Sequence, residues 1–291
     1  MIFVSGANGQ FAGSVIATLL AAGKAGQLVV GTRNVDSAFA RELAARGVSV
    51  RAADFRQPDQ MRRALAGADK ALFIPTYDTN DVRLQQNLNA LQAAQDANVK
   101  HVVYASFLRA ESPLVEHSRL VHFPTEQAIR ASGLDFTLLR HALYADILVG
   151  DLADTLGSGL LHRPSGGARS AYIARADLGI SAAQILMRDE PSGDTYTETM
   201  ERTWNGEEVA ELMSEVWGKT IRFVPVDPTE WPRYMTEKWG VPPEISRSTV
   251  GTMQAVSAGV FDLATQDYAR ITGRPPRDMR AFLEGVREAR R

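Results

Sequence analysis

An α/β fold with a doubly wound parallel sheet, followed by a smaller, mostly helical C-terminal lobe, is the fold class that the sequence predicts. Short apolar runs alternate with stretches of helical periodicity from residue 1 to about 140, and a glycine-rich segment directly follows the first run. Strands that alternate with helices form a parallel sheet covered on both faces, because the crossovers are right-handed. After about residue 140 this alternation ends, and all four tryptophans lie in that part of the chain.

The expected elements follow in chain order. Strands are expected at 2–4, 28–31, 48–50, 71–74, 102–105 and 136–139. The apolar residues of 10–22 recur at helical spacing and form one buried face. In the second part, helices are expected near 175–187, 205–217, 244–258 and 276–289, and short strands near 195–199 and 220–226. The tryptophans are interpreted as core packing rather than as a platform for substrate.

Residues 5–13, with the sequence SGANGQFAG, lie between the first expected strand and the first helix. In this position a glycine turn holds the pyrophosphate of a dinucleotide. Gly6 permits the sharp turn off the strand, Gly9 lets the backbone approach the phosphates, and the N–H groups at the helix start meet their negative charge. Glycine turns with a purely structural role are the alternative. The segment predicts cofactor contacts from Gly6, Ala7, Asn8, Gly9, Gln10 and Phe11.

The residues after the second strand favour NADP(H) over NAD(H). An NAD site usually has an acidic side chain there for the ribose 2′-hydroxyl, but this strand ends in Thr32-Arg33-Asn34. Arg33 offers a planar cation that can pair with a 2′-phosphate and stack on adenine. The alternative is a solvated arginine at a helix start. No second glycine segment is visible, so no flavin is expected.

Further cofactor contacts are expected after the third and fourth strands. Asp54 and Phe55 follow the third strand, where a carboxylate and an apolar ring can hold the adenine. Pro75, Thr76 and Tyr77 follow the fourth strand and are expected to line the ribose and nicotinamide. The domains expected are a Rossmann-type NADP(H)-binding domain at 1–150 and a smaller α+β substrate-binding lobe, interleaved with it, at 151–291.

Composition excludes several classes of function. The 291 residues carry a net charge of −2, which does not indicate a nucleic-acid or anionic-membrane partner. Cysteine is absent, so disulfides, thiolate catalysis and cysteine-ligated metals are excluded, and the five histidines lack metal-ligand spacing. No metal is therefore expected. No apolar run reaches membrane-spanning length and the first strand leaves no room for a signal peptide, so a cytoplasmic protein is expected, with a homodimer as a possible assembly.

The catalytic pair of short-chain dehydrogenases is missing. Those enzymes use Tyr-x-x-x-Lys on the helix after the fifth strand, where the lysine lowers the pKa of the tyrosine. That helix is expected within 114–131, yet no tyrosine lies between Tyr104 and Tyr144, and no lysine between Lys100 and Lys219. A literal match at 234–238 lies far outside the expected position and is interpreted as chance.

Other polar residues are expected near the reaction centre. Ser106 follows strand five and is predicted to contact the cofactor, and His117 and His122 follow it in the chain. His141 and Tyr144 leave strand six at the carboxyl edge of the sheet and should border the pocket. The candidate catalytic residues are therefore His122, His141 and Tyr144, with a hydrogen-bonded structural role as the alternative for His122.

His122 has a specific expected environment. Pro124 favours the first turn of a helix over 124–131, which places His122 at its N-terminal end. The helix dipole there favours the neutral imidazole. Glu126, four residues further on, is expected to orient the ring.

The chain resembles the NmrA-like atypical short-chain dehydrogenases, and within them type 2 NAD(P)H:quinone oxidoreductases and triphenylmethane reductase. The resemblance rests on stretches spread over nearly the whole length, at 5–13, 30–34, 50–61, 99–106, 122–146 and 174–186. It implies that residues 6–11 and Arg33 bind the dinucleotide phosphates, and that His122 and residues 141–146 line the substrate pocket. Those relatives usually carry glycine where Ala12 stands, and asparagine where His141 stands.

The expected function is that of an NADPH-dependent oxidoreductase whose partner is a small quinone or a related conjugated aromatic substrate. Such acceptors need little acid assistance, so positioning in a dry pocket can suffice without a Tyr-x-x-x-Lys pair. Two alternatives remain. One is a redox sensor that binds NADP(H) without turnover. The other is a tailoring oxidoreductase in aromatic polyketide biosynthesis, a monooxygenase-type role included.

Overall fold

The computed structural model describes residues 1–116, 118–189 and 193–290. The chain forms two compact units and passes between them several times. Unit 1 consists of Met1–Phe107, Leu120–Arg140 and Arg175–Tyr196. Unit 2 consists of Leu108–Arg119, His141–Ala174 and Thr197–Arg291.

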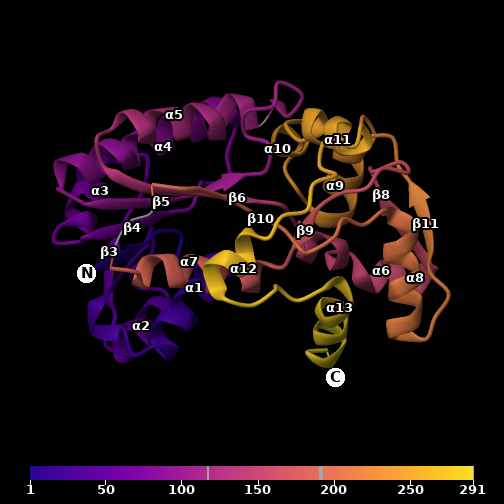
Figure 1. The fold of residues 1–291 in the computed structure, drawn as a ribbon, viewed down its shortest axis with the longest axis horizontal. Coiled ribbons are helices and arrows are strands. Elements are labelled where there is room, and N and C mark those ends of the chain that lie inside the picture. Colours follow the sequence, from indigo (N-terminus) through magenta and orange to yellow (C-terminus); the bar gives the residue numbers. More distant parts are fainter. Residues whose placement is uncertain (117, 190–192, 291) are drawn as a thin grey trace. The chain divides into compact units, whose positions relative to one another are not determined.

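A mainly parallel sheet forms the centre of unit 1 (Figure 1). In the described residues it has seven strands in the order β10-β6-β5-β4-β1-β2-β3. Their bounds are β1 Ile2–Val4, β2 Leu28–Thr32, β3 Ser49–Ala52, β4 Lys70–Phe73, β5 His101–Phe107, β6 Asp135–His141 and β10 Thr195–Glu198. Strand β1 pairs in parallel with β2 and β4, as do β2 with β3 and β4 with β5. The order reverses between β1 and β4, so the loops after these strands border a crevice at the carboxyl edge.

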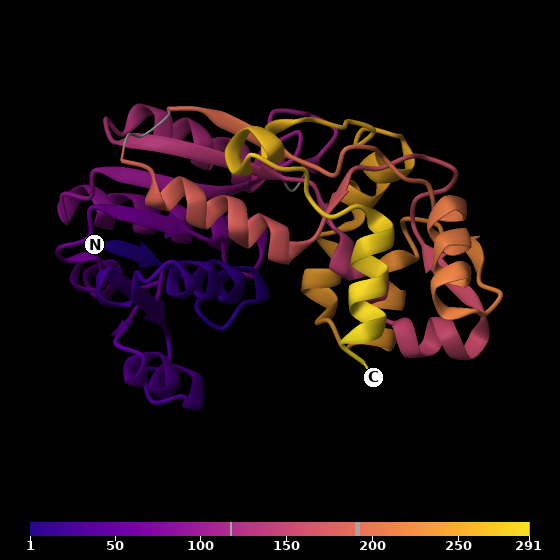
Figure 2. The same ribbon diagram turned by 60° about the horizontal axis from the view of Figure 1, so that its bottom comes forward.

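Helices cover both faces of this sheet, which confirms the predicted fold class. They are α1 Gln10–Ala21, α2 Ala38–Ala45, α3 Pro58–Leu65, α4 Asn80–Asp96, α5 Phe123–Ala131 and α7 Arg175–Met187, with the 3-10 turn η1 Ala25–Gln27 and the π-helical turn η2 Ser118–His122. Helix α4 packs between α3 and α5 on one face, and α1 lies against α7 on the other (Figures 1 and 2). At this contact a Cβ on Gly179 would lie 2.2 Å from Ser14 Oγ, so only glycine allows the two helices to approach so closely.

The core of unit 1 explains why its strands are continuously apolar. Strands β1 and β2 are buried at every position, since helices exclude water from both faces of the sheet. Under α3 and α4 the core is made of large side chains that include Phe3, Met61, Leu65 and Phe73. The glycine at the end of β2 belongs to this packing, because a Cβ on Gly31 would lie 2.6 Å from the Phe3 ring.

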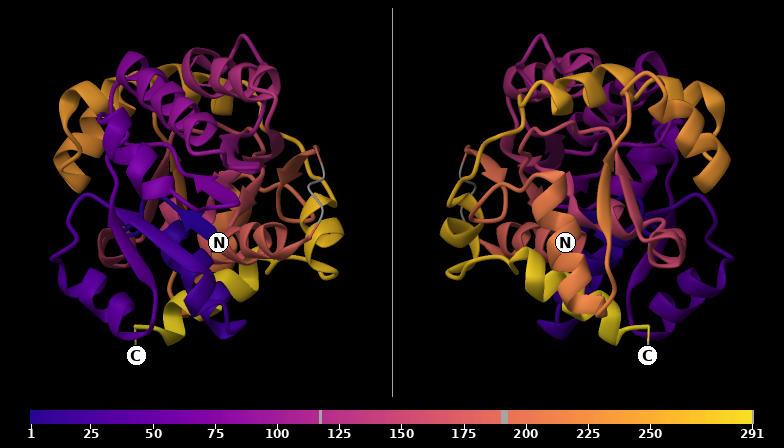
Figure 3. Two further views of the ribbon diagram at one scale, coloured as in Figure 1. Left: turned by 90° about the vertical axis from the view of Figure 1, so that its left-hand side faces the viewer. Right: turned by 90° about the vertical axis from the view of Figure 1, so that its right-hand side faces the viewer.

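Unit 2 is mostly helical, as predicted for the C-terminal lobe. Its helices are α6 Leu152–Ser158, α8 Gly206–Trp217, α9 Trp231–Trp239, α10 Pro243–Arg247, α11 Val250–Ser257, α12 Asp267–Thr272 and α13 Met279–Glu288, with the 3-10 turn η3 Ala145–Val149. Two short parallel pairs accompany them, β8 Leu160–Arg163 with β11 Arg222–Pro225, and β7 Leu143–Tyr144 with β9 Tyr172–Ile173. Helix α8 packs on β11 and on α13 (Figure 3), and α9 packs on α10 and α11.

Several elements of unit 2 differ from the expected ones, among them α6, α12 and the strands β7, β8 and β9, and two of the differences have a local explanation in the sequence. The helix expected at 244–258 is divided into α10 and α11, because Ser248 and Thr249 donate side-chain hydrogen bonds to the carbonyls of Ile245 and Ser246, at 2.7 Å each. Such local bonds compete with the helical pattern. Helix α9 was not expected at all, although a proline in its first turn, after Trp231, is a common start for a helix.

Candidate functional site

The glycine turn after β1 has the backbone geometry that phosphate binding requires. Gly6 has a φ of +68°, in the left-handed region that favours glycine. Ser5 Oγ accepts the Ile74 N–H at 2.9 Å and so joins the ends of β1 and β4. The Gly9 N–H donates to the Gly6 carbonyl at 2.9 Å, and a Cβ on Gly9 would lie 3.3 Å from that oxygen. A side chain at position 9 would crowd the turn, so backbone N–H groups form this wall.

A cavity of about 340 Å³ lies at this turn, within the size range of ligand pockets. The loops after β1, β2, β3 and β4 contribute its walls. Ten residues predicted to bind the cofactor line it: Gly6, Ala7, Asn8, Gly9, Arg33, Asp54, Phe55, Pro75, Thr76 and Tyr77. The sequence therefore indicated ten of the eighteen residues that line this cavity.

The walls carry both charge and aromatic surface. Burial raises the pKa of Asp54, but the backbone N–H and guanidinium of Arg56 outweigh it and lower that pKa overall, so Asp54 is a carboxylate. Phe55 packs edge-on against Phe73, with ring centroids 5.8 Å apart. Arg33 is exposed at the mouth of the cavity.

Eight of the lining residues were not predicted as cofactor contacts from the sequence, and Arg56 and Gln86 are two of them. Arg56 lies only two residues after Asp54, so its position in the chain is a signal that could have identified it. Gln86 lies on α4, and its side-chain oxygen accepts a hydrogen bond from the Thr76 hydroxyl. No local pattern identifies Gln86, because its place depends on how α4 packs beside the loop after β4.

Three of the residues predicted to bind the cofactor do not line this cavity: Gln10, Phe11 and Ser106. The Gln10 side chain accepts a hydrogen bond from Arg175 at 2.9 Å, and the Phe11 ring is buried. Both residues form the start of α1, where their backbone N–H groups remain the predicted contact. Ser106 is buried and donates to Glu126 Oε1 at 2.5 Å.

His122 is held in one orientation. It is the N-cap residue of α5, is buried, and does not line the 340 Å³ cavity. Its Nδ1 lies 3.0 Å from the Tyr104 hydroxyl oxygen, which also accepts a bond from Asn87 Nδ2 at 3.0 Å. Because that oxygen already accepts from Asn87, its own proton can be donated to His122 Nδ1, and in that arrangement the imidazole proton lies on Nε2. The Phe107 ring stacks on the imidazole with centroids 6.0 Å apart.

Glu126, which was expected to orient His122, has other partners among the described residues. The Glu126 carboxylate forms a bidentate pair with Arg140, with Nε–Oε1 and Nη2–Oε2 distances of 2.9 and 2.6 Å, and also accepts the Ser106 hydroxyl. This network joins β5, α5 and β6, and it leaves the orienting role to Tyr104. His117, which the sequence placed nearby, lies outside the described residues.

In unit 2, His141 and Tyr144 lie side by side. His141 Nδ1 is 3.4 Å from the Tyr144 hydroxyl oxygen, and His141 Nε2 is 3.5 Å from Glu198 Oε2. The His141 side chain is fully buried, and burial lowers its pKa to about 3, so the ring is neutral. Tyr144 is partly exposed. Of the two, Tyr144 is the side chain that a bound molecule can reach.

The Tyr-x-x-x-Lys match at 234–238 is not a catalytic pair. The Tyr234 hydroxyl donates to Asp151 Oδ2 at 2.7 Å, and Lys238 Nζ binds Asp154 at 3.1 Å. Burial and then Asp151 raise the pKa of Tyr234, whereas a catalytic phenol needs a lowered pKa. Over the parts of the chain that the structure describes, no helix is long and apolar enough to cross a membrane, and no acidic, histidine or cysteine side chains form a metal-binding group.

Comparisons with known proteins agree with this geometry. The chain is 29% identical over 279 residues to quinone oxidoreductase 2 of Escherichia coli strain K12, covering 94% of each protein. It is 28% identical to an NAD(P)H azoreductase of Xenophilus azovorans, covering 98% of this chain and 97% of that one. The crystal structure of a Citrobacter sp. triphenylmethane reductase complexed with NADP(H) superposes with a TM-score of 0.89 at 33% identity, covering 99% and 100%. The NmrA-like family model matches residues 1–256, and the chain belongs to the NmrA-like family.

Proposed function

We propose that this NAD(P)H-dependent oxidoreductase transfers hydride from NADPH to a quinone or a closely related conjugated aromatic acceptor. The observation that carries the proposal is the 340 Å³ cavity, because both the glycine turn and Arg33 line it. Relatives named for the reduction of quinones, azo compounds and triphenylmethanes, two of them crystallised with NADP(H) or NADPH, support the choice of acceptor and cofactor.

The cavity residues fit each part of a dinucleotide. The backbone of residues 6–11 would hold the pyrophosphate, since it presents N–H groups at the start of α1 and leaves no Cβ at Gly9. Arg33 would pair with the 2′-phosphate, and Asp54 with Phe55 would hold the adenine. Residues 75–77 would line the ribose and nicotinamide. When bound, NADPH supplies the hydride.

The proposed reaction needs one proton besides the hydride. A quinone that accepts a hydride becomes a hydroquinone anion, and the proton that completes the hydroquinone comes from water. His122 is proposed to donate a hydrogen bond from Nε2–H to the oxygen that gains negative charge, which stabilises it without transferring a proton. A hydrogen bond donated by Tyr104 to Nδ1 would favour the tautomer that this role requires.

Tyr144 and His141 are proposed to act together on the substrate side. The partly exposed Tyr144 hydroxyl would contact the acceptor, and the buried neutral His141 would position that hydroxyl from behind at 3.4 Å. Because a neutral imidazole keeps one nitrogen as an acceptor, it can accept a hydrogen bond from the Tyr144 hydroxyl. The phenol oxygen then keeps its lone pairs available to the substrate. Replacing Tyr144 with phenylalanine should then raise KM for the acceptor more than it lowers kcat.

The function is tested by NADPH consumption. Purified protein is mixed with NADPH and a panel of benzoquinones, naphthoquinones and triarylmethane dyes, and the loss of NADPH absorbance is followed while NADPH binding is measured separately by calorimetry. We expect turnover with at least one quinone, and His122→Phe should lower kcat by about tenfold or more. Tight NADPH binding with no consumption by any acceptor would refute the reductase function and favour a cofactor sensor.

A further inference from the structure

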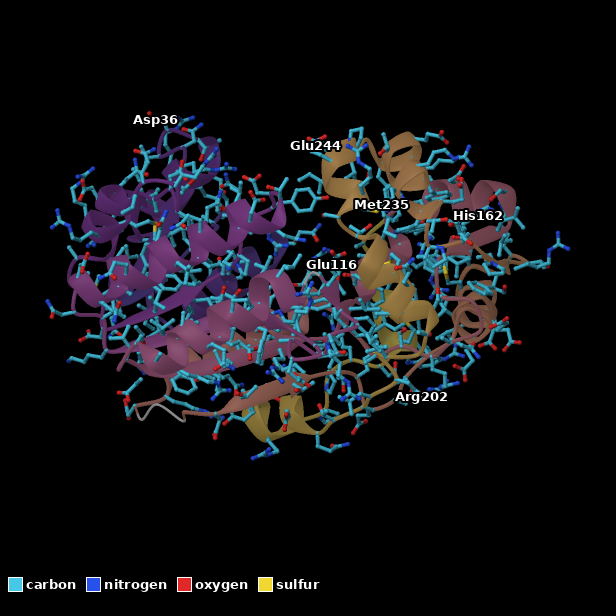
Figure 4. All side chains as sticks on the ribbon, turned by 90° about the horizontal axis from the view of Figure 1, so that it is seen from above. Asp36, Glu116, His162, Arg202, Met235 and Glu244 are labelled. Atoms are coloured by element: carbon cyan, nitrogen blue, oxygen red, sulfur yellow. The ribbon has the colours of Figure 1, made fainter. Side chains whose placement is uncertain are left out.

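The two acidic side chains that line the 340 Å³ cavity, Asp54 and Asp78, have different partners. Asp54 forms an ion pair with Arg56, with an Oδ1–Nε distance of 3.4 Å. Asp78 accepts hydrogen bonds from the backbone N–H of the next residue at 2.9 Å and from Gln86 Nε2 at 3.3 Å, and both donors are neutral. Asp36, in the segment between β2 and α2 (Figure 4), does not line the cavity. Among the described residues, Asp78 is therefore the acidic group of this cavity that no cation neutralises.

The hydrogen bonds of Asp78 have a definite direction. A carboxylate only accepts, so the Gln86 atom that faces it is the amide nitrogen. The amide oxygen of Gln86 then faces Thr76 and accepts the hydrogen of its hydroxyl. Gln86 is 4% exposed, so the packing of α4 holds this chain of hydrogen bonds in place. The Thr76 oxygen and the Asp78 carboxylate therefore present acceptors to the cavity rather than donors.

A wall of acceptors does not suit phosphate groups, which are themselves acceptors and carry negative charge. The glycine turn and Arg33, on the loops after β1 and β2, supply the N–H groups and the positive charge that phosphates need. The loop after β4 instead suits the nicotinamide end of the cofactor, whose carboxamide and ribose hydroxyls are donors. The nicotinamide ring is also the part that gains positive charge when the cofactor is oxidised.

We propose that the Asp78 carboxylate lies beside the nicotinamide ring and stabilises bound NADP⁺ relative to bound NADPH. The inference rests on the proposed function, in which residues 75–77 line the ribose and nicotinamide. When a hydride leaves for the acceptor, the C–H bond breaks, both of its electrons leave with the hydrogen, and a neutral ring becomes a cation. An opposite charge within about 4–6 Å favours the charged form of a group by roughly tenfold to thousandfold. The lower end applies to Asp78, because it is partly exposed. Asp78 thus favours hydride transfer toward the acceptor.

Calorimetry tests the inference by measuring the Kd of NADP⁺ and the Kd of NADPH, with no acceptor present. Asp78→Asn keeps the size of the side chain and an oxygen for the backbone N–H of Thr79, but it removes the charge. The ratio of the Kd of NADP⁺ to that of NADPH should rise about tenfold. The ratio is used because repulsion between Asp78 and the phosphates affects both forms alike. For a two-electron couple, tenfold corresponds to a rise of about 30 mV in the midpoint potential of the bound cofactor.

Asp81→Asn is the matched control. Asp81 lies in the first turn of α4, accepts the Thr79 hydroxyl at 2.8 Å, and does not line the cavity. It removes the same charge from the same helix start, so the ratio should change by less than about twofold. Should Asp78→Asn fail to fold, as its melting temperature would show, Asp78→Ser decides in its place, since serine also accepts from nearby backbone N–H groups. An unchanged ratio in the folded Asp78 variant, or an equal change in Asp81→Asn, would overturn the proposal.

The same samples separate this inference from the proposed function. If Asp78→Asn raises the ratio and no acceptor consumes NADPH, the placement of Asp78 beside the nicotinamide is correct and the reductase function is wrong. If a quinone consumes NADPH while Asp78→Asn leaves the ratio unchanged, the function is correct and the role of Asp78 is wrong.

Discussion

Replacing Arg140 with methionine should destabilise the native protein by about 3 kcal/mol, because it leaves the Glu126 carboxylate buried without its cation. The Glu126 side chain is 1% exposed and that of Arg140 is 17% exposed, with a closest contact of 2.6 Å. Removal of one partner from a buried ion pair costs roughly 3–5 kcal/mol. The lower end applies here because the Ser106 hydroxyl still donates to the carboxylate at 2.5 Å.

Urea unfolding followed by circular dichroism measures this loss of free energy. In thermal unfolding, the melting temperature should fall by about 6–12 °C, at roughly 2–4 °C per kcal/mol. Arg62→Met is the matched control, since its partner Asp59 lies 3.6 Å away and the two side chains are 51% and 84% exposed. An exposed pair contributes less than about 1 kcal/mol. Adding Glu126→Gln to Arg140→Met should restore part of the stability by removing the buried charge. If Arg140→Met cost no more than Arg62→Met, the buried network would not stabilise this fold.

Three further predictions concern the cofactor, a helix contact and pH. Arg33→Ala should weaken NADPH binding about tenfold and NADH binding less than about twofold by calorimetry; equal losses would remove the 2′-phosphate role. Gly179→Val should lower the free energy of unfolding by about 1–3 kcal/mol, since its Cβ would lie 2.2 Å from Ser14 Oγ; an unchanged value would contradict the contact of α1 with α7. Burial lowers the pKa of His101 from 6.5 to about 4, so between these pH values the unfolded chain binds more protons than the native protein. The contribution of the neutral His101 ring to stability is therefore complete above pH 6.5 and is lost as the pH falls through about 4. Between about pH 7 and about pH 4.5, the free energy of unfolding of His101→Gln should therefore fall by about 2 kcal/mol less than that of the unchanged protein. If urea unfolding showed the same pH dependence for both proteins, this reasoning would be refuted.

Many residues that line the 340 Å³ cavity could be predicted because their signals are local. Gly6 and Gly9 set the backbone of one turn, and their effect depends on φ and on the missing Cβ rather than on distant residues. Arg33, Asp54 and Thr76 each follow a strand of one parallel sheet, and the carboxyl ends of such strands meet at one edge. Strand order and direction therefore suffice to place these residues together.

The surroundings of His122 could not be predicted, because they depend on packing between elements. Glu126 lies on the same helix, so sequence spacing favoured it as the partner of the ring. In the structure Arg140, fourteen residues further on and in β6, binds the carboxylate instead. A guanidinium with two parallel donors outcompetes an imidazole for a carboxylate. Tyr104 then occupies the place at Nδ1.

A cavity of about 170 Å³ in unit 2, lined in part by Trp231 and Trp239, could not be predicted from the sequence either. Trp231 and Trp239 lie eight residues apart, a spacing that brings both to one face of a helix and is typical of core packing. Both are indeed packed, and they also border a void. Whether a set of apolar side chains fills its space or leaves a cavity depends on the sum of volumes from several elements, which no local pattern contains.

The pKa shifts of the tyrosines bear on which acceptors the protein can reduce. Burial raises the pKa of Tyr104 beside His122, and burial with Asp151 raises that of Tyr234. Neither of these two phenols is therefore prepared to give a proton to a substrate oxygen near neutral pH. General acid catalysis contributes roughly 10²–10⁴ in rate. An unactivated aliphatic ketone, whose alkoxide product needs that proton, should thus react at least about 100-fold more slowly than a quinone, whose reduced anion is stabilised by its aromatic ring. The comparison is made on kcat/KM from NADPH consumption, with both acceptors at the same pH. Comparable values for the two would show that a strong acid acts in this protein, and that the absence of the Tyr-x-x-x-Lys pair does not restrict its chemistry.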